Sequence, residues 1–328
     1  MIFKISFSQE KYTLSGKIVD DLSNETLIGV NIIFPEIPTG AITNEYGFYS
    51  ITLPKGIYKV QVSYLGFTTL EETIDLSQDI AKDFRLTENT EALDEIVITE
   101  DIEKINIRKP QMSVNSLSIK TIKQIPVVLG EVDIIKSIVL LPGVSNAGDG
   151  SAGFNVRGGS ADQNLILLDE AIIFNSSHLF GLFSVFNPDA IKDLKLYKGG
   201  IPAKYGGRVS SVLDIYQKEG NSKQFKMNGG IGLVTSRLLA EGPIKKNKGS
   251  FLVGGRTSYA HLFFPLFDLD NTAYFYDLNT KLSYNLNDNN NIFLSGYFGR
   301  DVFEVSDSFE NGYGNAVINF RWNHLFSD

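Results

Sequence analysis

The stretch that decides the fold is FNVRGGS at residues 154–160, with NLILLDE at 164–170 and LYKGGIPAKYGGR at 196–208. Each stretch sets a short apolar run beside glycines or acidic turn residues, which is typical of short strands joined by tight turns. The first and last stretches each place an arginine, Arg157 or Arg208, beside a pair of glycines. The sequence therefore predicts a domain of short strands connected by glycine-rich turns.

One helix and further strands are expected around these stretches. A helix is expected at residues 131–140, ended by Pro142. Its apolar positions share one face, and they are Val132, Ile135, Ile138 and Val139. Strands are expected at three places, residues 154–157, 165–168 and 194–197. Asn187 is expected to cap a short helix with Pro188 in its first turn. This order predicts a small α+β domain.

The chain after residue 214 changes to long strands with alternating faces. From Tyr274 to Leu286, tyrosines and leucines fill most alternate positions, and mainly polar residues stand between them. The run exceeds a usual soluble strand and is typical of a tilted membrane strand. Ile318, Phe320 and Trp322 repeat the pattern. Short turns are expected at residues 245–249 and 288–291, and a longer polar loop at 305–312. About six such strands fit before residue 328, which predicts the first strands of a transmembrane antiparallel β-barrel.

The first segment is expected to form an all-β sandwich. Between residues 13 and 88, apolar residues alternate with polar ones, as at Tyr58, Val60 and Val62. Turn residues at 44–48 and 54–56 separate the strands, and no helical period intervenes. Residues 1–9 are either the stump of a signal peptide or a frayed first strand.

Composition argues against several classes of function. A net charge of −8 and a pI near 5.1 oppose nucleic-acid binding. The absence of cysteine mildly favours an exported protein without disulfides. No apolar run of about twenty residues occurs, so no transmembrane helix is predicted. No catalytic or metal-ligand pattern stands out, so no enzyme activity, metal or cofactor is expected. His178 is expected to pack or to hydrogen-bond rather than to bind a ligand.

The glycine-rich stretches resemble the plug domain of TonB-dependent outer-membrane receptors, in which a plug seals the lumen of a large β-barrel. The residues that carry this plug motif are Gly158, Gly159, Asp169, Gly206 and Gly207. The first segment resembles the carboxypeptidase-regulatory-like domain, a transthyretin-like sandwich, through GKI at 16–18, TNEYGFY at 43–49 and GIYKV at 56–60.

The resemblance implies a multi-domain chain of four segments. They are a sandwich at residues 13–88, a linker at 89–104, a plug at 105–218 and a partial outer-membrane β-barrel at 222–328. A plugged barrel has about 22 strands, so the sequence is interpreted as the N-terminal part of a longer, truncated receptor.

The linker carries a segment that a partner protein could bind. Acidic residues flank a β-branched run, and the segment is Asp94, Glu95, Ile96, Val97, Ile98 and Thr99. Such a segment can add as a strand to the edge of another sheet through backbone hydrogen bonds. It resembles a Ton box, which the TonB energy-transducing protein binds. The alternative is that it forms the last strand of the sandwich.

The resemblance also assigns a role to Arg157 and Arg208. In the family, plug arginines beside glycines pair with barrel glutamates and lock the plug in the lumen. A guanidinium suits this role because it stays charged and presents a rigid fork to carboxylates. The alternative is that both are solvated surface arginines.

The implied function is energised import of a scarce solute across the outer membrane of a Gram-negative cell, with the sandwich and Ton box in the periplasm. The implied partners are TonB, outer-membrane lipid and an unidentified solute. The plug ending at residues 205–215 departs from the Ala-Asn-Gly-Val type of the SusC-like glycan importers, which puts a partner surface lipoprotein in doubt. Two other classes compete. One is a non-transporting binding or signalling module, and the other is a carboxypeptidase-type enzyme, which the missing metal ligands oppose.

Overall fold

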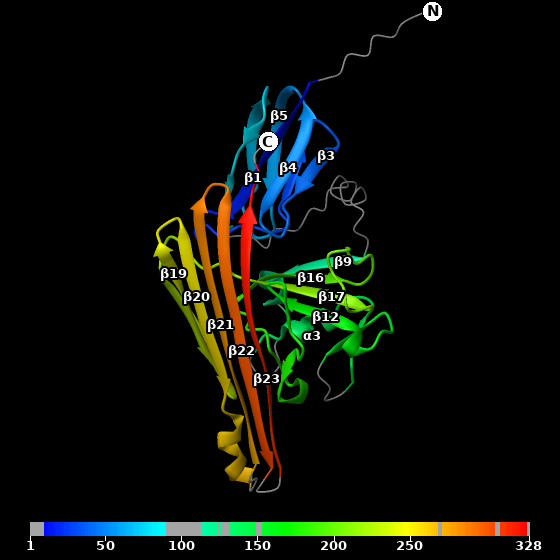
Figure 1. Cartoon of the computed structure of the whole chain (residues 1–328), viewed down its shortest axis with the longest axis vertical. Coiled ribbons are helices and arrows are strands. Elements are labelled where there is room, and N and C mark those ends of the chain that lie inside the picture. The colour runs from blue at the N-terminus through cyan, green and yellow to red at the C-terminus, as the bar shows by residue number, and fades with distance from the viewer. Residues whose placement is uncertain are drawn as a thin grey trace, which may run out of the picture. The chain divides into compact units, whose positions relative to one another are not determined.

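The structure is a computed structural model of the chain, and Figure 1 shows its strands and helices. It describes residues 10–89, 113–123, 125, 131–148, 153–267, 271–305 and 309–326. The chain divides into two compact units, Met1–Pro110 and Gln111–Asp328, and each is described by itself below. The segment expected as a Ton box, from Asp94 to Thr99, lies outside the described residues.

The first unit consists of two small sheets that share one core. One sheet has the order β4-β1-β7, with β8 also paired to β1, and the other has the order β3-β2-β5-β6. The strands are β1 (Lys11–Asp20), β2 (Asn31–Phe34), β3 (Thr39–Ile42), β4 (Phe48–Pro54), β5 (Gly56–Ser63), β6 (Leu70–Leu76), β7 (Ile80–Ala81) and β8 (Phe84–Leu86). Ile18, Ile32, Val60 and Val62 are fully buried in this core. The predicted sandwich and its alternation are confirmed.

A turn between β3 and β4 shows how local chemistry shapes the sandwich. The side-chain oxygen of Asn44 accepts hydrogen bonds from the backbone N–H groups of Tyr46 and Phe48, at 2.9 and 3.0 Å. Gly47 has a φ of 69°, which a glycine adopts without a steric penalty. The turn expected at residues 44–48 therefore forms for the reason that its residue types suggest.

The second unit opens with an α+β domain. Its central sheet has the order β13-β12-β17-β16-β9, in which β12 and β17 are parallel. The strands of this sheet are β9 (Val114–Ser118), β12 (Asn164–Leu168), β13 (Ala171–Ile172), β16 (Ile191–Tyr197) and β17 (Ser211–Gln217). The other elements are α2 (Ile119–Ile122), α3 (Ile134–Val139), β10 (Val144–Asn146), β11 (Phe154–Val156), η1 (Ala161–Gln163), β14 (Ser177–His178), η2 (Leu179–Gly181) and β15 (Phe183–Ser184).

Helix α3 forms where the apolar period predicted it. Asp133 is its N-cap, and the carboxylate accepts a hydrogen bond from the Lys136 N–H at 2.9 Å. Ile134, Ile135 and Ile138 are buried in the main core of the domain, together with apolar residues of β12, β16 and β17. The strands predicted at residues 154–157, 165–168 and 194–197 are also present.

The helix expected after Asn187 is wrong, because the chain makes a turn there. The Asn187 side chain accepts a hydrogen bond from the Asp189 N–H, and its carbonyl accepts one from the Ala190 N–H, both at 3.0 Å. Strand β16 begins at Ile191, and it pairs with β9 on one side and β17 on the other. Only three residues remain between Asn187 and the strand, so sheet pairing outweighs the local helix signal. The sequence analysis did not place β9 or β17 as strands.

The rest of the second unit is a six-stranded antiparallel sheet, which we call the wall sheet. Its strands lie in chain order, β18-β19-β20-β21-β22-β23, side by side in Figure 1. They are β18 (Lys226–Ile231), β19 (Thr235–Lys245), β20 (Gly249–Ser258), β21 (Asn271–Asn287), β22 (Asn290–Val305) and β23 (Phe309–His324), with η3 (Ala260–Phe267) between β20 and β21. Strand β21 has 17 residues and contains the whole alternating run from Tyr274 to Leu286. No helix among the described residues is long and apolar enough to cross a membrane.

The longer loop expected at residues 305–312 is wrong. Strands β22 and β23 pair all the way from Asn290 and His324 to Val305 and Phe309, so only residues 306–308 separate them. The polar residues from Glu310 to Gly312 lie in the strand. These residues form a strand because the backbone of β22 pairs with them continuously, whereas their polar composition alone had suggested a loop.

The two faces of the wall sheet differ in polarity. On β21, Phe275, Asp277, Asn279 and Lys281 are at most 4% exposed. The residues between them, such as Tyr276 and Leu278, are 40% and 44% exposed. The exposed side chains of β21 are therefore mainly apolar, and the buried ones, apart from Phe275, are polar and face the α+β domain. The alternation predicted for a wall strand is confirmed.

Candidate functional site

The polar face of the wall sheet meets the α+β domain through buried ionic side chains. Among the described residues, three groups of these ionic contacts are centred on Asp169, on Arg256 with His178, and on Asp189. Charged residues are almost never fully buried unless they are paired.

Asp169 forms the first centre, in the tight turn between β12 and β13. Asp169 and Glu170 have φ values of 48° and 72°, a left-handed conformation that costs non-glycine residues energy. Lys281 of β21 donates to the Asp169 carboxylate at 3.0 Å and to the Gln217 carbonyl at 2.9 Å. The Asp169 carboxylate also accepts the Gln217 N–H at 3.0 Å. Asp169 and Lys281 are 1% and 3% exposed, so this pair is shielded from water.

Strands β21 and β23 extend the first centre. Asn279 donates to the Gln217 side-chain oxygen at 3.1 Å, and Asn319 donates to the Asp169 carbonyl. Arg321 lies 3.9 Å from the Glu170 carboxylate. Two strands of the wall sheet thus hold one turn of the α+β domain.

Arg256 of β20 forms the second centre. Its guanidinium donates to Glu131 of the α+β domain at 2.5 Å and to Asp277 of β21 at 2.6 and 2.9 Å. It also donates to the Ser184 carbonyl at 2.7 Å and lies over the Phe275 ring, 5.1 Å from its centroid. Such a planar fork can satisfy several acceptors at once, which suits a buried site.

His178 extends the second centre to β22. One ring nitrogen, Nδ1, lies 2.7 Å from the Asp301 carboxylate, and the other, Nε2, lies 3.2 Å from Asp277. The Tyr297 hydroxyl lies 3.3 Å from Nε2. The ring stacks on Phe275 with 4.1 Å between centroids. The expectation that this histidine packs and hydrogen-bonds is confirmed.

Asp189 forms the third centre, in the turn that follows Asn187. Lys123 after α2 and Arg237 of β19 each donate to its carboxylate at 2.7 Å. Burial raises the pKa of Asp189, but the two cationic donors outweigh burial and hold the pKa below its usual value. Asp189 is therefore ionised across the neutral range.

Most ion pairs of the interface share one polarity, and His178, which faces Asp277 and Asp301 of the wall sheet, is the exception. The α+β domain contributes the carboxylates Glu131, Asp169 and Asp189, and the wall sheet contributes Arg256, Lys281 and Arg237 opposite them. The lock expected from the sequence has the reverse polarity, with Arg157 and Arg208 facing barrel glutamates.

The structure places these two arginines away from the three centres. Arg157 has a φ of 49°, and its guanidinium donates to the Ser113 hydroxyl at 2.8 Å. Arg208 donates to the carbonyl of its neighbour Gly207 at 2.9 Å. Their pairing with barrel carboxylates stays a prediction.

The motif glycines explain the shape of this region. Gly158 and Gly207 have φ values of 84° and 82°, so both turn the chain in a left-handed conformation. A side chain at Gly159 would meet Ser210, because an added Cβ would lie 2.3 Å from the hydroxyl oxygen. The Ser210 hydroxyl donates to the Val156 carbonyl at 3.1 Å. Gly159 therefore lets the loop before β17 pack against the end of β11. Around Gly206, an added Cβ would meet nothing within 4 Å.

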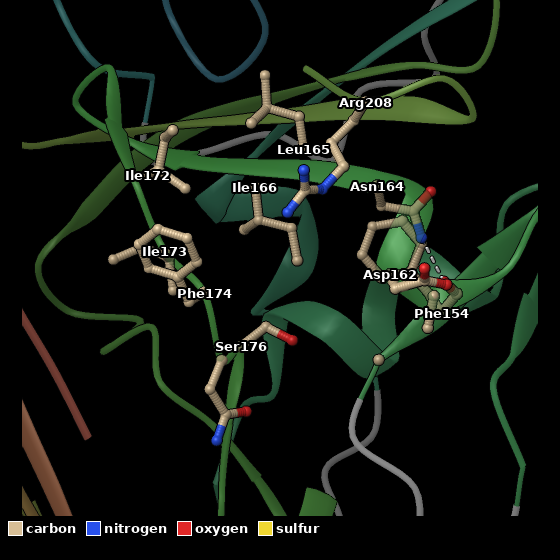
Figure 2. A pocket seen from close by; sticks show the side chains of 13 residues that line it. Phe154, Asp162, Asn164, Leu165, Ile166, Ile172, Ile173, Phe174, Ser176 and Arg208 are labelled. Carbon is tan, nitrogen blue, oxygen red and sulfur yellow. Dashed lines mark hydrogen bonds between the residues drawn. The ribbon is translucent and has the colours of Figure 1, made fainter. Parts of the chain in front are cut away.

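Arg208 lines a pocket of about 370 Å³ in the α+β domain. Figure 2 shows its guanidinium over the apolar residues Leu165 and Ile166, with Ile172, Ile173 and Phe174 on the opposite side. The Asn164 amide is already used, since it donates to the Phe154 carbonyl and accepts from Ser211. The pocket thus combines apolar walls with the polar side chains of Asn164, Asn175 and Ser176 and with two charged residues, Arg208 and Asp162.

Two buried carboxyl groups of the central sheet do not take part in the interface. Burial raises the pKa of Asp193 on β16 to about 7. Burial also raises the pKa of Asp214 on β17, although its carboxylate accepts from the hydroxyls of Tyr205, at 2.6 Å, and Tyr216. Among the described residues, no group of three or more His, Cys, Asp or Glu side chains is arranged to hold a metal ion.

Sequence reasoning did not identify the partners on the wall strands as functional residues. The available signal was a charged residue on the polar face of a long alternating strand, as at Asp277 and Lys281. That signal predicts an inward orientation, but it does not say which residue lies opposite.

Comparisons with known proteins agree with this arrangement of domains. Residues 14–98 match the CarboxypepD_reg-like domain, and residues 106–212 match the TonB-dependent Receptor Plug Domain. The first match includes residues 94–98 of the expected Ton box. The TonB-dependent receptor SusC of Bacteroides thetaiotaomicron is 29% identical over 237 residues, which cover 67% of this chain and 22% of that protein.

Solved structures of receptors also resemble this chain. The siderophore receptor PirA from Pseudomonas aeruginosa matches with a TM-score of 0.49 and 17% identity, over 67% of this chain and 39% of that one. PirA from Acinetobacter baumannii matches with a TM-score of 0.45 and 17% identity, over 59% and 32%. The chain thus spans a minor part of the length of these relatives. It is a homologue of TonB-dependent receptors, with a CarboxypepD_reg-like domain ahead of a TonB-dependent receptor plug domain.

Proposed function

We propose that this chain acts in the import of a scarce solute across the outer membrane, with TonB as the energy source. In this proposal the α+β domain, called the plug from here on, closes the lumen that the wall sheet borders. The sandwich and the segment from Asp94 to Thr99 face the periplasm, and TonB binds that segment as a Ton box. The outer face of the wall sheet contacts lipid.

The observation that carries the proposal is the distribution of polarity across the wall sheet. The outward side chains of β21 are mainly apolar, and inward cations of the wall sheet pair with plug carboxylates in buried contacts such as Asp169 with Lys281. An apolar outer band and a polar interior are what a lumen-lining wall in a membrane requires. A soluble sandwich would need the opposite arrangement.

Arg157 and Arg208 complete the proposal as further locking residues. Both would pair with carboxylates of the wall in the complete receptor, in addition to the three centres described above. The nature of the solute is left open, and the likeness to SusC supports the receptor class alone. A surface lipoprotein partner remains doubtful because of the plug ending at residues 205–215.

The test uses the complete protein and the C-terminal domain of TonB. Val97→Pro should abolish binding, because proline removes a backbone donor from an added strand. Thr90→Pro, in the same linker but outside the segment, is the matched control and should bind normally. Unchanged binding by the Val97 variant would contradict the Ton box assignment.

A second measurement separates transport from signalling. Whole cells with and without TonB would be given radiolabelled ferric chelates and oligosaccharides as probes. Energised uptake that Val97→Pro abolishes supports import. TonB binding that leaves the uptake of every probe unchanged would favour a signalling module instead.

A further inference from the structure

His178 lies in a buried cluster that has more acids than bases. The ring is 1% exposed, on the short strand β14 of the plug. The titratable groups in direct contact with it or its partners are Asp277 on β21, Asp301 and Tyr297 on β22, Arg256 on β20 and Glu131 before α3. All five are at most 4% exposed. Asp133 and Tyr313 lie farther out and interact electrostatically with Arg256 and Asp301. The protonation state of the ring therefore determines how much of the negative charge in the cluster is neutralised.

The geometry places a carboxylate at each ring nitrogen. Asp301 lies 2.7 Å from Nδ1, and Asp277 lies 3.2 Å from Nε2. An ionised carboxylate only accepts hydrogen bonds, so both contacts need an N–H on the ring. A ring with two N–H groups is an imidazolium. A neutral ring could keep only one of these contacts and would turn Nε2 toward the Tyr297 hydroxyl as an acceptor.

The charge count selects between these two states. With a neutral ring, Arg256 alone would offset three carboxylates, those of Glu131, Asp277 and Asp301. One oxygen of Glu131 and one of Asp277 already lack a hydrogen-bond partner among the described residues. Among the described residues, the Asp301 carboxylate accepts hydrogen bonds only from the His178 ring and from the Leu179 N–H, each at 2.7 Å. Buried charges that stay unpaired are costly, so a second cation is favoured.

We propose that His178 is a charged positioning residue, which carries a proton on both ring nitrogens while the plug is seated against the wall sheet. The imidazolium bridges Asp301 of β22 and Asp277 of β21, and Phe275 supports the ring from one side. This inference rests on the proposed role of the plug as a closure, and it adds a proton to the conditions for that closure.

A dependence on pH follows from the bridge. Loss of one proton from the ring breaks the contact at Nε2 and leaves the cluster with only one cation. Seating of the plug at β14 and β15 is therefore strongest at the acidic end of the neutral range and weakens as the pH rises. Where the seated state holds one proton that the opened state has released, the population of opened β14–β15 segments rises about tenfold per pH unit.

The first test observes the ring directly. The complete protein is labelled with ¹⁵N-histidine in detergent micelles, and His178→Gln identifies the ring signal of interest. We expect both nitrogens of His178 to be protonated at pH 6.5. The exposed His324, which contacts Asn290, is the matched control, and His324→Gln should leave that signal unchanged. A neutral His178 ring at pH 6.5 would overturn the inference.

The second test measures hydrogen exchange of the amides in β14 and β15 from pH 6 to pH 9, corrected for the chemical rate. The wild type should open more at high pH. The His178→Gln variant keeps a neutral donor but lacks the charge. Its β14 and β15 segments should therefore open more than those of the wild type at pH 6, and their opening should not depend on pH. Asp301→Asn removes one acid, so it should flatten the profile as well. A flat wild-type profile would refute the bridge. Both tests measure the plug and the wall sheet and do not require transport. A failure of the proposed import function can therefore be distinguished from a failure of this inference.

Discussion

Replacement of Lys281 by methionine tests whether the Asp169 centre holds the plug. Methionine keeps much of the length of the side chain and removes its charge, which leaves the carboxylate of Asp169 buried at 1% exposure. Removal of one partner from a buried pair costs about 3–5 kcal/mol. Asp169 keeps its bonds from the N–H and the side-chain amide of Gln217, so we expect a value near 3 kcal/mol.

The assay is the free energy of unfolding of the complete protein by urea in detergent micelles. Asp169→Asn and the double variant with Lys281→Met complete a double-mutant cycle. The double variant should be less destabilised than the sum of the two single ones, with a coupling of about 1–3 kcal/mol. Lys245→Met, at an exposed position of the same sheet, is the matched control and should change little.

Two outcomes would refute this reasoning. One is that the two single effects add to within about 0.5 kcal/mol, which is the behaviour of independent sites. The other is that Lys281→Met and Lys245→Met have equal effects. A leak of large antibiotics through the outer membrane offers an independent reading, since a loosened plug should admit them in Lys281→Met and exclude them in the double variant.

Three further predictions concern residues of the plug. Because burial raises the pKa of Asp193 to about 7, the free energy of unfolding should fall by up to about 4 kcal/mol as the pH rises from about 4 to 7. Urea titrations at several pH values measure this slope, and Asp193→Asn should flatten it. Because the pKa of Asp189 is lowered, its contribution to the free energy of unfolding should be lost only as the pH falls below about 4, and Asp189→Asn should remove that contribution at every pH. If the variant and the wild type lost stability equally below about pH 4, this would contradict the prediction. Gly159→Ala should lower the free energy of unfolding by about 1–3 kcal/mol, because the added Cβ would clash with Ser210, and Ser210→Gly should restore that stability. A loss that Ser210→Gly leaves in place would contradict the clash.

The sequence predicted which face of a strand or helix is buried, but it did not predict which residues pair across the interface. Alternation from Tyr274 onward predicted which side chains of β21 point inward, because a strand has a fixed period of two. The pairing of Lys281 with Asp169 spans 112 residues, and no local pattern contains that information. The apolar spacing at Ile135 and Ile138 predicted α3 in the same way, because the period of a helix is also visible within its own sequence.

Local signals failed where pairing in the sheet decided the outcome. The capping signal at Asn187 was genuine, since its side chain does accept from the Asp189 N–H. The strand that begins at Ile191 left no room for a helix. The polar run after Val305 likewise joined a strand, because β22 offered a paired backbone along its whole length.

The buried pairs between the plug and the wall sheet also bear on how the molecule folds. Family comparisons match the plug by itself, yet the chain from Gln111 to Asp328 forms one compact unit. Lys281 and Arg256 can leave water without a large penalty only when Asp169 and Glu131 are already opposite them. Neither half then reaches its native state first. We expect plug and wall to unfold in one cooperative transition, and the sandwich to melt separately from both.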